Sequence, residues 1–172
     1  MSRYSLKILS GAIVGLFLVC AGTLRAQTVS DGDQQFMNEA ASGGMAEVDL
    51  GRLAARKGAN AQVRSFGNRM VRDHSKANAE LKSLASRMHV TLPTEMTDEQ
   101  KTEKANLMKL SGAEFDREYM RMMVEDHDKD VAAFQQKSAG AADATLKAWV
   151  TKTLPTLEEH QRLAHAIQGK VQ

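Results

Sequence analysis

A seven-residue phrase occurs twice in the sequence, and this recurrence constrains the fold more than any other feature. Residues 70–76 and residues 123–129 both read Met-Val-x-Asp-His-x-Lys, 53 positions apart. The match extends beyond the phrase at the same offset, in the pairs Arg64 and Arg117, Phe66 and Tyr119, Ala79 and Ala132, and Leu81 and Phe134. The recurrence predicts a duplicated helical unit within one chain.

The sequence around both phrases favours helix. Beyond the N-terminal region, only Pro93 and Pro155 interrupt long stretches rich in Ala, Leu, Met, Lys, Glu and Gln, which are good helix formers. No segment alternates apolar and polar residues with period two, as a half-buried strand would. The expected fold class is therefore all-α, and specifically a four-helix bundle.

Capping and stop signals give the expected bounds. The four long helices are predicted at about residues 33–57, 60–89, 112–138 and 141–168. Thr97 and Gln100 form a capping box that opens a short extra helix between the second and third long helices, and a second box at Ser111 opens the third. Gly169 is expected to end the last helix, which Pro155 should bend or divide in two.

The N-terminus is typical of a secretory signal peptide over residues 1–26. Its apolar run, Ile8 to Val19, is about 12 residues long, which is too short to span a bilayer. Cleavage after Ala26, or alternatively after Ala21, would remove Cys20 and leave one domain, residues 27–172, with no disulfide. We therefore expect a periplasmic or secreted protein without a transmembrane span.

Charge and motif content exclude several classes of function. Arg3, Lys7 and Arg25 lie in the leader, so the formal charge of +2 falls to −1 once it is removed. No basic stripe with interleaved aromatic residues is present, and nucleic-acid binding is not expected. The sequence contains no recognisable nucleophile-and-base arrangement or phosphate-binding loop, so an enzyme is not favoured. The sequence leaves protein partners and homo-oligomerisation open.

Helical periodicity places one ligand-type side chain on the inward face of each long helix. These residues are Glu47, His74, His127 and His160, each the polar member of an apolar stripe. Imidazole and carboxylate groups together suit iron, manganese, copper or zinc. The sequence therefore predicts a site for one transition metal inside the bundle.

Depth along the bundle ranks these candidates. His74 and His127 stand about equally far from the starts of their helices, so they share a level if the two helices are parallel. Glu47 is expected about 6 Å from that level, whereas His160 is expected about 13 Å from it and is the weakest candidate. Asp73 and Asp126 each precede a stripe histidine by one residue. They are candidates for orienting the histidines or for binding the metal from a neighbouring face.

Each feature also has a simpler interpretation. Core histidines are often satisfied by one hydrogen-bond partner and bind nothing. Met70 and Met123 stand four residues before His74 and His127, a spacing that would suit Cu(I), but methionine is also the ordinary gap-filler of helical cores.

Four further positions lie outside the predicted ligand set. Gly43 and Gly44 indicate either a close helix approach, which we prefer, or room for a ligand beside His74. His89 and His165 lie off the inward stripes and are expected on the surface.

A set of motifs extends over nearly all of the chain after the leader. They are Asp33-x-x-Phe36, Ala40-Ala41-x-Gly43-Gly44-x-x-Glu47-Val48-x-Leu50-Gly51, Met70-x-x-Asp73-His74, Phe115-Asp116, Tyr119, Met123, His127 and Leu154-Pro155-x-Leu157-x-x-His160. As a set they resemble the exported bacterial proteins of the domain of unknown function 4142. This resemblance implies a ferritin-like helical bundle, often described as an outer-membrane or periplasmic protein, with no established activity. Val71 and Val124 stand where the Glu-x-x-His motif of di-iron proteins would need glutamate, so a di-iron oxidase is not expected.

Overall fold

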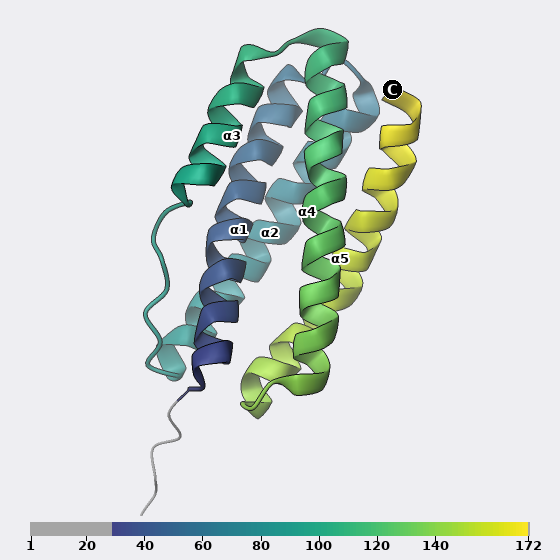
Figure 1. The fold of residues 1–172 in the computed structure, drawn as a ribbon. Coiled ribbons are helices and arrows are strands. Elements are labelled where there is room, and N and C mark those ends of the chain that lie inside the picture. The colour runs from purple at the N-terminus through teal and green to yellow at the C-terminus, as the bar shows by residue number, and fades with distance from the viewer. Residues whose placement is uncertain (1–28, 172) are drawn as a thin grey trace, which may run out of the picture.

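The computed structural model describes residues 29–171, and these residues form five helices without any strand (Figure 1). The helices are α1 (Asp31–Lys57), α2 (Ala61–Arg87), α3 (Asp98–Lys109), α4 (Gly112–Gly140) and α5 (Ala144–Val171). The four long helices form a bundle, and the short α3 lies along the outside of α1 (Figure 1). The predicted all-α four-helix bundle with a short extra helix is thus confirmed. The predicted signal peptide lies outside the described residues.

Local capping chemistry explains most helix starts. Ser30 accepts a hydrogen bond from the Asp33 N–H at 3.1 Å and begins α1. The predicted capping box of α3 is confirmed, since Thr97 and Gln100 exchange side-chain to backbone hydrogen bonds of 3.2 and 2.9 Å. The box predicted at Ser111 is wrong, because Gly112 adopts the left-handed conformation with φ 58° and Ser111 makes no side-chain cap.

The last helix differs from its predicted bounds at both ends. Asp143 accepts hydrogen bonds from the Thr145 and Leu146 N–H groups at 2.7 and 2.8 Å, so α5 begins at Ala144, three residues later than expected. The helix continues through Pro155 without dividing. It also passes Gly169, which is exposed in the last turn and costs only about 1 kcal/mol there.

Two buried aspartates join the α1–α2 pair to the α4–α5 pair at opposite ends of the bundle. Asp116, near the start of α4, accepts hydrogen bonds from the N–H groups of Ala59 and Asn60 at 3.0 and 2.6 Å. Asp33, near the start of α1, accepts from two N–H groups of the α4–α5 turn at 3.2 and 3.3 Å. The starts of α2 and α4 therefore lie at the same end. The helices α2 and α4 are therefore parallel. The segment containing α3 runs from the end of α2 back to the end of the bundle at which α4 begins (Figure 1).

Burial follows the predicted stripes and forms two apolar clusters. One cluster is built around Phe66, Tyr119 and Met123, and the other around Phe36 and Phe134. The stripe histidines and Glu47 are all buried. Among the described helices, none has the length and apolar character needed to cross a membrane.

The backbones of α1 and α2 come closest at a pair of glycines. A Cβ atom at Gly67 would lie 2.6 Å from the carbonyl oxygen of Gly51, and one at Gly51 would lie 2.8 Å from that of Gly67. The close helix approach preferred for Gly43 and Gly44 is found at Gly44, where a Cβ atom would collide with the side chain of Asn78 of α2. It is wrong for Gly43, which faces open space.

Candidate metal centre

Three buried imidazoles meet in the middle of the bundle. His74 of α2, His127 of α4 and His160 of α5 each offer one ring nitrogen, and these three nitrogens lie within 4.8 Å of one another. The ring centroids are 5.3 to 5.7 Å apart. Only 5%, 0% and 1% of the three residues, in that order, is exposed. We call these residues the histidine cluster.

The position of His160 corrects the sequence-based ranking. The expected offset of about 13 Å assumed that the third long helix ended near residue 138 and that the fourth began at residue 141. Because α4 extends to Gly140 and α5 begins at Ala144, His127 and His160 lie about 13 and 16 residues from the intervening turn. Three residues correspond to about 4.5 Å of helix rise, which two side chains can bridge. The weakest candidate is therefore a full member of the cluster.

Hydrogen-bond partners fix the tautomers of two rings. Nδ1 of His127 lies 2.9 Å from the carbonyl oxygen of Met123, which can only accept, so Nδ1 carries the proton. Nε2 of His160 lies 3.0 Å from a carboxylate oxygen of Asp73, so Nε2 is protonated there. The lone pairs of the neutral rings are then on Nε2 of His127 and Nδ1 of His160.

The nitrogens left over by these bonds are the unpartnered ones. Nε2 of His74, Nε2 of His127 and Nδ1 of His160 are buried and have no hydrogen-bond partner in the described part of the chain. Leaving a buried polar atom unpaired costs about 1 to 3 kcal/mol. Three such atoms in one place are unusual for a core that uses its histidines only for packing.

Burial also keeps the rings in the neutral form. Burial and the neighbouring His160 lower the pKa of His127 to about 4, although its hydrogen bond to Met123 opposes this. Burial and the other two imidazoles lower the pKa of His74 well below its usual value. Burial lowers the pKa of His160 too, against the effect of Asp73. Neutral imidazole is the form that binds metals, so no proton needs to be removed near neutral pH.

Asp73 orients a different histidine from the one beside it in the sequence. Its carboxylate is bonded to His160 and, at 2.9 Å, to the Nε of Arg72. Burial alone would raise the pKa of Asp73, but the hydrogen bonds from His160 and Arg72 lower it, so the carboxylate stays ionised. A histidine held by a carboxylate is the usual arrangement around protein-bound metals.

Glu47 lies beside the cluster but not within it. Its Oε1 is 3.9 Å from Nδ1 of His127, but the group of mutually close ligand atoms found among the described residues contains the three histidines without Glu47. Glu47 is only 3% exposed and neither oxygen has a partner. Burial and the nearby Asp126 and Asp130 raise the pKa of Glu47 well above its usual value. The buried hydroxyl of Tyr119 is also unpartnered, and burial and Glu47 raise its pKa.

Asp126 does not take the role predicted for it. It is half-buried, and burial together with Glu103 of α3 raises its pKa to about 6. Burial and Asp126 raise the pKa of Asp130 to about 7. Asp126 therefore belongs to a group of carboxylates between α1, α3 and α4, and not to the histidine cluster. Asp130 was missed in the sequence, although its spacing of four residues from Asp126 places both on one helix face.

The simpler interpretations hold for the residues outside the cluster. Met70 and Met123 are fully buried members of the apolar core, as expected of gap-fillers. His89 and His165 are exposed, as predicted, and His165 pairs with Asp128 at 2.9 Å.

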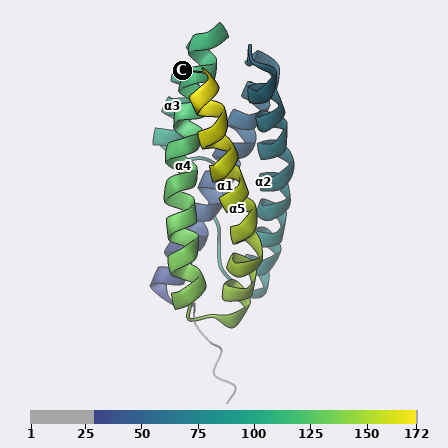
Figure 2. The same cartoon turned by 90° about the vertical axis from the view of Figure 1, so that its right-hand side faces the viewer.

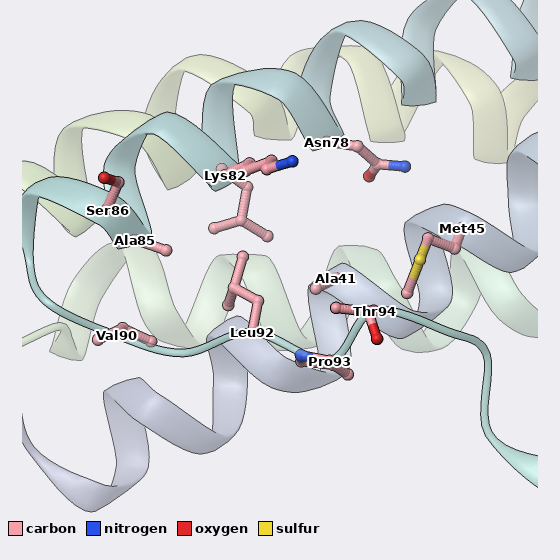
Figure 3. A pocket seen from close by; sticks show the side chains of 11 residues that line it. Ala41, Met45, Asn78, Lys82, Ala85, Ser86, Val90, Leu92, Pro93 and Thr94 are labelled. Atoms are coloured by element: carbon pink, nitrogen blue, oxygen red, sulfur yellow. The ribbon is translucent and has the colours of Figure 1, made fainter.

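A surface groove of about 500 Å³ lies elsewhere, between α1, α2 and the segment that follows α2 (Figure 3). Figure 3 shows apolar side chains such as Leu92 and Ala85 facing across it. Lys82 is the one charged residue in its lining. The groove offers no set of metal ligands, so the chemistry is concentrated in the bundle interior, where α2, α4 and α5 lie side by side (Figure 2).

Comparisons with known proteins agree with this fold. The family described as "Domain of unknown function (DUF4142)" matches residues 19–167. A solved structure titled "Crystal structure of DUF305 fragment from Deinococcus radiodurans" is similar at a TM-score of 0.72 and 15% sequence identity, over 83% of this chain and 98% of that one. No curated protein matches the chain. At this identity the structural likeness concerns the fold alone.

Proposed function

We propose that this chain, which belongs to the DUF4142 family, is an exported helical-bundle protein that binds one transition-metal ion at the histidine cluster. The observation that carries the proposal is the convergence of three buried imidazoles from three different helices, each with a ring nitrogen that has no hydrogen-bond partner among the described residues. A single cation among them would satisfy all three at once.

The donor set narrows the choice of metal. Three neutral imidazoles favour zinc, copper or iron over manganese, which prefers oxygen ligands. Nitrogens around a tetrahedral zinc ion lie about 3.4 Å apart, given bond lengths of about 2.0 to 2.1 Å, so the rings would have to draw together slightly. Glu47, beside His127, is a buried carboxyl group with a raised pKa, and its loss of a proton on metal binding would offset part of the charge of the ion in this apolar interior.

Export is supported by the leader over residues 1–26 and has its own test. The chain should be recovered from the periplasm or medium, with an N-terminal mass that corresponds to cleavage after Ala26 or Ala21. A full-length product that stays in the cytoplasm would contradict export without affecting the metal site.

Metal binding is tested on mature protein purified without a histidine tag. Titration with Zn²⁺, Co²⁺ and Cu²⁺ should reach one ion per chain, and Co²⁺ should show visible absorption bands of a nitrogen-ligated ion. Replacing His74, His127 or His160 by alanine should lower the affinity at least about 100-fold, because each removes a direct ligand. The His89→Ala, His165→Ala double variant changes two exposed histidines and is the matched control.

The competing function is that of an envelope protein that acts through its surface and binds no metal. A wild-type chain that takes up none of these ions, while remaining folded by circular dichroism, would favour it. Binding that persists in all three cluster variants would place the metal elsewhere and contradict the proposed site.

A further inference from the structure

The carboxylates between α1, α3 and α4 lie next to the histidine cluster and have no evident structural role. Asp126 and Asp130 stand one turn apart on α4, and Glu103 of α3 is close enough to act on Asp126. Within residues 29–171, no side-chain hydrogen bond holds either aspartate. Glu47 is close enough to both aspartates to feel their charge, and it is fully buried with two unpartnered oxygens. A buried, unpartnered carboxylate at this position points to a cation as its natural partner.

Open space adjoins these carboxylates on α1. A Cβ atom at Gly43 would meet no other atom within 4 Å. Gly43 stands four residues before Glu47 and therefore shares its helix face. The side chain of Lys137 on α4 bonds the carbonyl oxygen of Gly32 on α1 at 2.9 Å, which sets the register between these antiparallel helices.

Counting from that contact aligns the open space with the acidic residues. Gly43 lies about 11 residues after Gly32, and Asp126 lies about 11 residues before Lys137, so both are at the same height in the bundle. The missing side chain at Gly43 thus leaves room in the α1–α4 interface at the level of Asp126.

We propose that this space is the route by which a divalent cation reaches the histidine cluster, with Asp126 and Asp130 attracting the ion and Glu47 passing it to His127. The inference rests on the proposed metal function. Oε1 of Glu47 is 3.9 Å from Nδ1 of His127, so the ion would then pass along the ring edge to reach the unpartnered Nε2. Carboxylates that line a narrow opening concentrate cations there and raise association rates.

The opposite side of the cluster is less suited to cations. A depression over Asp73 is lined by four basic side chains from α2 and α5, namely Arg69, Arg72, Lys76 and Lys152, together with Glu80 and Glu159. Asp73 is already bonded to Arg72 and His160. That lining carries four basic side chains against three carboxylates, counting Asp73. On the α1–α4 side, Asp126 and Asp130 act together with Glu47 and Glu103, and the basic residues that act on them are Lys129 and, for Asp126 alone, Arg121.

The test measures the rate of Co²⁺ binding by stopped-flow absorbance at pH 8 and low ionic strength. In the Asp126→Asn, Asp130→Asn double variant, the association rate constant should fall about threefold to tenfold, with the dissociation constant rising by no more than the same factor. The Gly43→Leu variant should slow binding at unchanged charge, because the leucine side chain would occupy the open space. Circular dichroism checks that both variants are folded, and Gly43→Ala serves as a milder second obstruction.

The matched control is the Glu125→Gln, Asp128→Asn double variant. It removes the same charge from the same helix, at side chains that are 52% and 46% exposed. Its association rate should stay within about 1.5-fold of wild type. The route is overturned if the Asp126, Asp130 variant binds Co²⁺ as fast as wild type, or if the two double variants slow binding equally. A wild-type protein that binds no Co²⁺ would instead overturn the metal function and the route together.

Discussion

The carboxylate of Asp73 on α2 accepts a hydrogen bond from Nε2 of His160 on α5 at 3.0 Å. This bond fixes the orientation of an imidazole whose other nitrogen, Nδ1, is buried without a partner among the described residues. A second pair has the same chemistry, since Nε2 of His165 lies 2.9 Å from a carboxylate oxygen of Asp128. Both of its side chains are exposed, and His165 is not a member of the histidine cluster. The chain therefore contains one histidine–carboxylate pair that would orient a ligand and one that would not.

Removing the two carboxylates should have unequal effects on metal binding. Asp73→Ala should lower the affinity about 10- to 100-fold, because His160 loses the partner that fixes its tautomer and orientation. Asp128→Ala should change the affinity by less than about twofold. Competition with a chelator of known affinity measures both. Equal losses in the two variants would show that Asp73 does not position a ligand.

The metal-free protein should lose stability as the pH falls from about 6.5 to about 4. The pKa of His127 is about 4 in the folded chain and about 6.5 when unfolded, so the unfolded state takes up the proton first. The contribution of neutral His127 to the free energy of unfolding is present above pH 6.5. It is lost progressively below that pH, by about 3 kcal/mol at most. Urea unfolding at several pH values should show a smaller loss for His127→Leu than for wild type. Identical pH profiles would contradict the prediction.

The effect of Asp130 on stability should change with pH in the opposite direction to that of His127. Burial and Asp126 raise its pKa to about 7, so the ionised carboxylate destabilises the folded chain at higher pH. Asp130→Asn should therefore raise the melting temperature by several degrees at pH 8, and the gain should shrink as the pH falls through 7 toward 4. The pKa of Asp128 is lowered instead by bonds from His165 and Gln161, so Asp128→Asn should bring no such gain.

Two glycines of α1 and α2 should respond oppositely to alanine. A Cβ atom at Gly67 would lie 2.6 Å from the backbone oxygen of Gly51 and 2.9 Å from Ala54. Gly67→Ala should destabilise the protein by about 1 to 3 kcal/mol or more, because the two helices must move apart. Gly43→Ala meets nothing and should gain up to about 1 kcal/mol from helix propensity. Chemical denaturation checks both, and a neutral Gly67→Ala would refute the tight contact.

Periodicity was sufficient to predict the bundle and the inward faces. Each of the four ligand-type residues chosen as the polar member of an apolar stripe is buried. The parallel arrangement of α2 and α4 was one of two that the sequence permitted, and it places His74 and His127 together as expected. These features follow from the spacing of apolar and polar residues within each helix, which can be determined from a single sequence.

The errors concern relations between helices. The height of His160 depended on the turn around Asp143, where a shift of three residues changes the level by about 4.5 Å. The partner of Asp73 lies 87 residues away on α5, and no local pattern indicates it. Gly51 and Gly67 contact each other only because of the way α1 and α2 cross. Such partners are set by packing across the whole bundle.

Asp33 and Asp116 have a consequence for how the molecule folds. Each supplies hydrogen-bond acceptors to the turn of the other helical pair, so neither pair can satisfy the backbone donors of its own turn. Either helical pair alone would leave backbone N–H groups of its turn without these acceptors. The chain should therefore gain and lose its structure cooperatively, in a single transition in which the two halves form together.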